Sequence, residues 1–120
     1  MSNAGVYCGT AFLMSKESRM ADNVKQAVLK ADAMDLLLFR TIPAYYRSLP
    51  GELANELVAM DKAGATNEEL GRKMGGFTKL RIGMLEGDMN TGYVSVGNGI
   101  SFIHEIRTAK QIIDNLTKDF

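Results

Sequence analysis

The sequence predicts a mainly α-helical chain with one or two short strands. Apolar residues recur at the three- and four-residue spacing of a helix in several segments, and two Thr-x-x-Glu or Thr-x-x-Gln capping boxes mark helix starts. Runs of strand-forming residues are few and short by comparison. The 120 residues, of which 46% are apolar, fall in the size range of one ordinary domain. We therefore treat residues 1–120 as a single unit.

The N-terminal part of the chain carries the first strand signal. Gly5-Val6-Tyr7-Cys8 is a short apolar run rich in strand formers, and Gly9 interrupts it at once. This pattern predicts one strand that runs into a turn at Gly9-Thr10. Residues 5–13 are therefore the expected strand and turn, and residues 14–120 are the expected helical remainder.

A helix, a weak strand and an irregular stretch are expected next. Asp22 can cap a helix whose apolar residues repeat at helical spacing and which should end near residues 32–34. The apolar run that follows is too short for periodicity to assign, and we predict a weak strand over Asp35 to Phe39. Two flanking prolines predict irregular structure around Tyr45 and Tyr46.

Helix signals dominate the middle of the chain. A helical pattern begins at Glu52 and stops at Gly64, and the capping box Thr66 to Glu69 then opens a short helix that reaches Met74. The apolar residues after Gly75-Gly76 predict a further helix that closes at Gly87. Residues 88–92 are turn-forming types.

Two more helices are expected toward the C-terminus. The apolar residues between Tyr93 and His104 lie on one helical stripe, although two glycines lower the helix propensity there. Thr108 to Gln111 is the second capping box, and it opens a helix with Ile112, Ile113 and Leu116 turned inward. The whole pattern predicts five or six helices.

Charge and cysteine content exclude several classes of partner. Fourteen Lys and Arg balance fourteen Asp and Glu, so there is no excess positive charge for nucleic acid or for an anionic membrane surface. No stretch approaches the roughly 20 apolar residues that cross a bilayer. Cys8 is the single cysteine, so no internal disulfide can form, which suits a reducing cytoplasm. The sequence therefore predicts a cytoplasmic protein with no nucleic-acid or membrane partner.

Gly9-Thr10 is the local feature most typical of a ligand site. A glycine after a strand exposes backbone N–H groups, a threonine hydroxyl adds a donor, and together they can hold a phosphate. The alternative is a plain turn in which Thr10 starts a helix. His104 is more typical of a polar residue near a helix end than of a catalytic group. No metal-ligand cluster, catalytic triad or dinucleotide loop is visible in the sequence.

The ordered motifs of the chain resemble one known family. Residues 5–13 read G-V-Y-C-G-T-A-F-L, and S-K-E-S follows at residues 15–18. These motifs are similar to the last-strand signature of nitronate monooxygenases, formerly 2-nitropropane dioxygenases, and of the related flavin-dependent enoyl-acyl-carrier-protein reductase II. Gly87-Asp88 and Gly97-Asn98 resemble the closing G-D and G-Q elements of that family, and the likeness extends to about Leu116. Asn98 stands where the family usually has Gln, so we assign it no contact.

The resemblance implies a flavoprotein oxidoreductase built on a (β/α)₈ TIM barrel. This chain would then be a C-terminal helical fragment of the FMN barrel, with residues 5–13 as the last barrel strand and its phosphate turn. In the family the Gly-Thr pair at the end of that strand helps to hold the FMN phosphate, so the implied cofactor-binding residues are Gly9 and Thr10. The catalytic His of the family lies upstream of this segment, so the resemblance implies no catalytic residue here. The isolated chain is expected to be inactive and to bind FMN weakly or not at all.

Several alternatives stay open. The resemblance does not separate nitronate oxidation from enoyl reduction, and a small-molecule substrate is expected only in a complete barrel. It also leaves open whether the chain is an engineered piece, a natural truncation or the product of a decayed gene. The alternative function is a stand-alone helical interaction module without catalytic activity. We expect a homo-oligomer, as a two-fold dimer, through the strand around Val6 and the apolar run Leu36 to Phe39.

Overall fold

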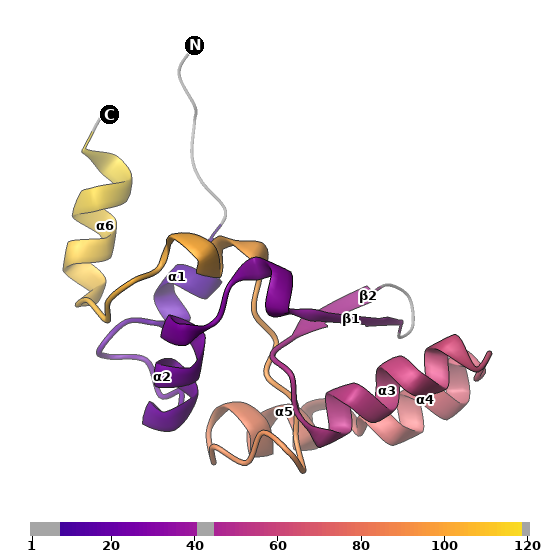
Figure 1. Cartoon of the computed structure of the whole chain (residues 1–120). Helices are drawn as coiled ribbons and strands as arrows, with labels where there is room; N and C mark the ends of the chain where they lie inside the picture. Colours follow the sequence, from indigo (N-terminus) through magenta and orange to yellow (C-terminus); the bar gives the residue numbers. More distant parts are fainter. Residues whose placement is uncertain (1–7, 41–44, 119–120) are drawn as a thin grey trace.

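The computed structural model describes residues 8–40 and 45–118, which form a mainly helical structure with one two-stranded antiparallel sheet (Figure 1). The α-helices of this part are α1 (Thr10–Leu13), α2 (Asp22–Lys30), α3 (Glu52–Lys62), α4 (Asn67–Met74), α5 (Gly76–Met84) and α6 (Ala109–Thr117). The strands are β1 (Leu37–Arg40) and β2 (Tyr45–Ser48), and two 3₁₀ helices are η1 (Ala33–Asp35) and η2 (Asn98–Phe102). The predicted mainly α-helical class with one or two short strands is confirmed.

The N-terminal strand cannot be compared with the structure in full. Residues 5–7 lie outside the described residues, and Cys8 has no regular secondary structure. Gly9 then caps the four-residue helix α1, so Thr10 is its first helical residue. Thr10 therefore has the position that the plain-turn alternative gave it.

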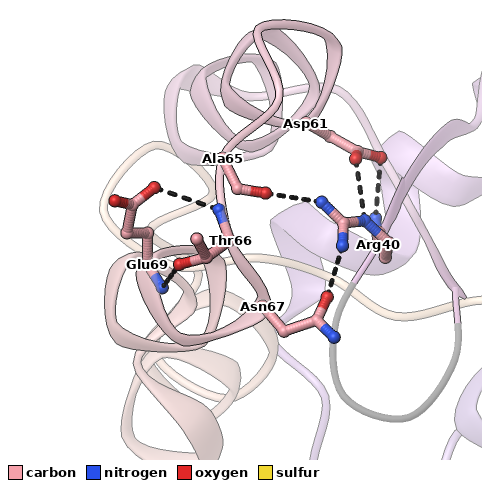
Figure 2. Close-up of polar contacts among 6 residues, drawn as sticks. All are labelled: Arg40, Asp61, Ala65, Thr66, Asn67 and Glu69. Carbon is pink, nitrogen blue, oxygen red and sulfur yellow. Dashed lines mark hydrogen bonds and ion pairs between the residues drawn. The ribbon is translucent and has the colours of Figure 1, made fainter.

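Both predicted capping boxes are confirmed. The Thr66 hydroxyl accepts from the Glu69 amide at 3.2 Å, and the Glu69 carboxylate accepts from the Thr66 amide at 3.0 Å (Figure 2). Thr108 and Gln111 make the same reciprocal pair at 3.1 and 2.9 Å. Because each box satisfies two N–H groups that a helix start leaves without partners, α4 and α6 begin where the sequence predicts.

Helix α2 differs from the prediction at both ends. Asp22 is its first helical residue rather than its cap, because Ala21 occupies the cap position without a side-chain hydrogen bond. The helix ends at Lys30, ahead of the predicted end at residues 32–34. Asp32 and Asp35 instead form their own capping box around η1. This local pairing of side chain and backbone competes with continuation of the helix.

Tyr45 and Tyr46 lie in strand β2, not in irregular structure. β2 pairs with β1 in antiparallel register, with Phe39 opposite Tyr46 and Leu37 opposite Ser48. Strand β1 also begins later than predicted, at Leu37 rather than Asp35. Phe39 of β1 is fully buried against α3. Its burial stabilises the hairpin, and the residues around the prolines do not reveal this contact.

The predicted helical stripe from residue 93 to residue 104 is wrong. Residues 93–97 contain no helix, and the short 3₁₀ helix η2 follows them. Val94 accepts a backbone hydrogen bond from Leu49 at 3.1 Å, and Ser95 forms an isolated bridge with Ser48. Contacts with distant residues therefore replace the internal bonds of a helix, in a segment where glycines already weaken helix formation.

The last helix is also less buried than predicted. Ile112 is buried, but Ile113 is 48% exposed and Leu116 is only half-buried. Figure 1 shows α6 extending away from the other helices at one end of the molecule. Its inward face is therefore covered mainly at its first turns.

The described residues bury two hydrophobic clusters. The first cluster consists of Met14, Met20, Val24, Val28, Leu49, Met84, Val94, Val96 and Ile100. The second cluster consists of Phe39, Leu53, Ala54, Leu57, Leu70, Met74 and Tyr93. Leu80 of α5 packs against both clusters. The first cluster thus joins α2 to the segment before η2, and the second joins the hairpin to α3 and α4.

Arg40 links the end of β1 to the turn between α3 and α4 (Figure 2). Its Nε donates to Asp61 Oδ1 at 3.0 Å, and its two Nη groups donate to Ala65 O and Asn67 Oδ1. Asp61 Oδ2 also accepts from the Arg40 backbone amide at 3.3 Å. This carboxylate covers an edge N–H that would otherwise be available to another strand.

Candidate functional site

A cavity of ≈ 460 Å³ lies between α1, the segment around η2, and α6. Its wall is formed by Cys8, Gly9, Thr10, Ala11, Met14, Gly99, Phe102, Ile103, His104, Glu105, Arg107, Ile112, Asn115 and Leu116. The cavity therefore combines residues from both ends of the described chain. Its volume falls in the range typical of small-molecule sites, about 300–1,000 Å³.

Both residues predicted from the sequence, Gly9 and Thr10, line this cavity. The Thr10 Oγ1 accepts a hydrogen bond from the Gly97 amide at 2.9 Å. Because the backbone N–H occupies one lone pair of the oxygen, the hydroxyl proton stays available for a second partner. Gly97 belongs to the predicted Gly97-Asn98 element, so the structure brings these two motifs together.

Three ionisable side chains near the C-terminal wall complete the polar part of the cavity. Arg107 Nε donates to Glu105 Oε1 at 2.6 Å, which fixes the guanidinium by one edge. His104 is exposed and lies two residues after the end of the 3₁₀ helix η2, rather than on the α-helical stripe that the sequence suggested. Asn98 is not among the residues of the wall.

No sequence pattern indicates Arg107 or Glu105 as site residues. They lie about a hundred residues from Gly9, and they reach the cavity because residue 107 bridges to Ser15 and the Arg107 carbonyl accepts from the Lys16 amide at 2.8 Å. Local spacing cannot reveal such a pairing. The sequence feature that comes nearest to marking Arg107 is its position directly before the Thr108 capping box.

The chemistry of the wall favours binding an anionic group beside an apolar one. Thr10, His104 and Arg107 supply donors, and Glu105 is the carboxylate of the wall. Met14, Phe102, Ile103 and Leu116 are among the apolar members. No cluster of three or more potential metal ligands exists among residues 8–40 and 45–118.

The comparisons with known proteins agree on one family. The family model described as nitronate monooxygenase matches residues 2–119. FabK from Thermotoga maritima has a similar structure, with a TM-score of 0.78 and 27% sequence identity over 93% of this chain and 35% of that chain. A methionine-to-alanine mutant of the same FabK gives a TM-score of 0.68 and 28% identity over 93% of this chain and 32% of that chain.

The matched solved structures are longer than this chain. The chain spans about a third of the length of the FabK chains that it matches. A search of curated proteins finds no match.

Within the part of the chain that the structure describes, no helix has the length and apolar character needed to span a membrane.

Proposed function

Because the chain belongs to the nitronate monooxygenase family, we propose that it forms part of an FMN-dependent oxidoreductase, where Gly9 and Thr10 contribute to the FMN phosphate site. The observation that carries the proposal is the position of this Gly-Thr pair in the wall of a cavity that is also lined by the Arg107 guanidinium. The helices would cover one side of the parent enzyme. In this proposal the chain corresponds to the C-terminal third of a (β/α)₈ barrel, in keeping with the share of FabK that it matches.

The donor set of the cavity fits a phosphate group. A phosphate has several acceptor oxygens, and the Thr10 hydroxyl and the Arg107 guanidinium are suitable donors. Glu105, the acid of the wall, is already bonded to Arg107, which lowers its repulsion of an anion. When bound, FMN would supply reversible electron and hydride transfer, and this chain would bind and orient its phosphate end.

The substrate of the parent enzyme is either a nitronate or an enoyl thioester, and the described residues do not choose between the two. Both alternatives belong to the family that the motifs resemble, and FabK is the enoyl-acyl-carrier-protein reductase II of that family. The proposed role of this chain is the same in both cases. We also propose a cytoplasmic location, since the single Cys8 cannot form an internal disulfide.

The isolated chain should be inactive and should bind FMN only weakly. Tight small-ligand sites bury most of the ligand, whereas this cavity supplies one wall of the proposed flavin site. Fluorescence titration of the purified chain with FMN tests this directly. We expect no stoichiometric capture at micromolar concentration, and Thr10→Val should weaken any residual binding while the exposed Thr78→Val leaves it unchanged. Tight capture, or equal effects of the two variants, would contradict the proposal.

A second candidate function is a stand-alone self-associating module. Met34 is 91% exposed and Phe102 is 87% exposed, and they lie on the neighbouring 3₁₀ helices η1 and η2. Two large apolar side chains this exposed favour association.

The dimer contacts predicted from the sequence are the strand around Val6 and the apolar run Leu36 to Phe39, and the residues of this run differ in exposure. Phe39 is buried within its own chain and Leu38 is 48% exposed, while Val6 lies outside the described residues. Light scattering after size exclusion decides the matter. A doubled mass that Phe102→Ser abolishes would support self-association, and a mass of 13.1 kDa at micromolar concentration would exclude it.

A further inference from the structure

The loop at residues 15–18, which follows α1, contacts the start of α6, although Glu17 and Ala109 are 92 residues apart in the sequence. Both carboxylate oxygens of Glu17 accept from the Ala109 amide, at 2.9 and 3.1 Å. Ala109 is the first residue of α6, and α6 supplies part of the cavity wall. We propose that Glu17 is a positioning residue for this cavity, because it fixes the helix that closes one side of it. The inference rests on the proposed function for the importance of the cavity, but not for the contact itself.

The Glu17 carboxylate accepts from one amide that the capping box leaves without a partner. The box of Thr108 and Gln111 satisfies the amides of those two residues, and the Ala109 amide lies between them. A helix N-terminus carries partial positive charge, so a carboxylate at this point is stabilised by the helix dipole as well as by the hydrogen bond. A neutral acceptor at position 17 could keep the hydrogen bond but would lose the favourable interaction with the helix dipole.

The loop is also held from its other side by a buried lysine. Lys25 of α2 is 3% exposed, and its Nζ donates to the carbonyls of Ser15 at 2.7 Å and Ser18 at 2.9 Å. These two carbonyls lie on either side of Glu17 in the chain. The ammonium group therefore restricts the backbone that carries the carboxylate, so that Glu17 meets α6 in a fixed place.

Helix α6 has few other attachments to the described residues. Ile112 is its buried residue, and Ile113 on the same helix is 48% exposed. Figure 1 shows the helix extending away from α2 and from the hairpin. Ile112, Asn115 and Leu116 nevertheless form one side of the cavity. The position of that side therefore depends on the contact between Glu17 and Ala109, together with the backbone hydrogen bond from Lys16 to Arg107 and the packing of Ile112.

Hydrogen exchange in the full chain tests the inference without any ligand. In Glu17→Ala, amides of residues 112–117 should exchange roughly fivefold faster, which is the order of effect expected for loss of an N-terminal cap. Amides of α3 should not change. Glu17→Gln keeps an acceptor oxygen and should restore most of the protection. Glu56→Ala is the matched control, because it removes an exposed carboxylate that lies in α3, and it should leave α6 unchanged.

A binding measurement with FMN as the probe then links the helix to the cavity. FMN binding is monitored through the chemical shifts of Gly9 and Thr10. We expect this weak binding to decrease in Glu17→Ala and to recover in Glu17→Gln. Unchanged exchange of α6 in Glu17→Ala, or equal effects of Glu56→Ala, would overturn the positioning role. If α6 loosens as expected while even the unaltered chain gives no FMN shifts, the proposed function fails and the structural contact stands.

Discussion

The two hydrophobic clusters are assembled in different ways. Every buried residue of the second cluster comes from one continuous stretch, residues 39–93, whereas the first cluster combines residues 14–28 with Leu49 and with residues 84–100. Arg40 adds polar links within the second region, and both segments that it joins belong to that region. The first region instead borders the cavity through Met14.

This difference separates a self-contained part of the chain from a part that carries the candidate site. The hairpin, α3 and α4 follow one another in the sequence, so most contacts of their core form at a low cost in loop entropy, and Tyr93 is the member that comes from farther along the chain. The cavity forms only when α1 meets residues about ninety positions away, as in the hydrogen bond from Gly97 to Thr10. The candidate site therefore lies where the fold depends most on long-range contacts.

The largest expected effect comes from opening the second cluster. Leu57 of α3 is fully buried there, so Leu57→Ala should cost about 3 kcal/mol of unfolding free energy, through lost burial and the cavity left behind. Leu85→Ala, at a side chain 44% exposed, should cost less than about 0.5 kcal/mol. Urea denaturation measures both. Hydrogen exchange of Leu57→Ala should show α3 and α4 loosened while α2 keeps its protection. Equal loosening of α2 would show that the two regions unfold as one unit.

A second substitution tests the junction between the two clusters. A Cβ on Gly83 of α5 would lie 2.2 Å from the Tyr93 carbonyl oxygen, so Gly83→Ala must push α5 away from the segment that joins the clusters. We expect a loss of about 2 kcal/mol of unfolding free energy. Gly71 in α4 has open space around it, and Gly71→Ala should stabilise by up to about 1 kcal/mol through helix propensity. Thermal unfolding that ranks the two variants the other way would contradict this close contact.

A smaller effect is expected from Tyr93, which belongs to the second cluster and donates its hydroxyl to Gly76 O at 3.2 Å. Burial, and secondarily the neighbouring Tyr46, raise the pKa of Tyr93 above its ordinary value of 10.0. A raised pKa in the folded state gives stability that is fully present below pH 10.0 and lost as the pH rises through the folded value. Tyr93→Phe should cost about 1 kcal/mol near neutral pH and should lose less stability above pH 10. Tyr45→Phe, at a side chain 58% exposed, is the control.

The smallest expected effect concerns the turn at residues 88–91. Hydrogen bonds from Thr91, and then from the Asn90 amide, hold the pKa of Asp88 below its ordinary value of 3.8. A lowered pKa gives stability that is present above pH 3.8 and lost as the pH falls through the folded value. Asp88→Asn should therefore be slightly less stable than the unaltered chain at pH 7, and the difference should vanish in strong acid. A difference that persists unchanged at acid pH would contradict this assignment.

Local signals in the sequence predicted the parts of the fold that local forces determine. The capping boxes at Thr66 and Thr108 place α4 and α6 correctly, because the paired groups are three residues apart. The segment after Tyr93 was assigned to a helix because its apolar spacing fits one, yet its partners are Ser48 and Leu49. Strand β2 pairs with the adjacent β1, but the flanking prolines favour irregular structure, and the spacing of residues 45–48 does not reveal that pairing.

The candidate site divides in the same way. The motifs that resemble the family identified Gly9 and Thr10, and both line the cavity. Arg107 and Glu17 were not singled out as site residues, because the first reaches the cavity through a bridge to Ser15 and the second acts on Ala109, 92 residues away. Only the three-dimensional arrangement brings such residues together.

We propose that this cavity holds the phosphate end of a flavin nucleotide. Chemical-shift titration of the isotope-labelled chain with FMN, and separately with riboflavin, tests it most directly because riboflavin lacks the phosphate. We predict that millimolar FMN shifts the amides of Gly9, Thr10 and Ala11, whereas riboflavin leaves them unchanged. Equal shifts with both ligands, or no shifts at these three residues with millimolar FMN, would contradict the claim.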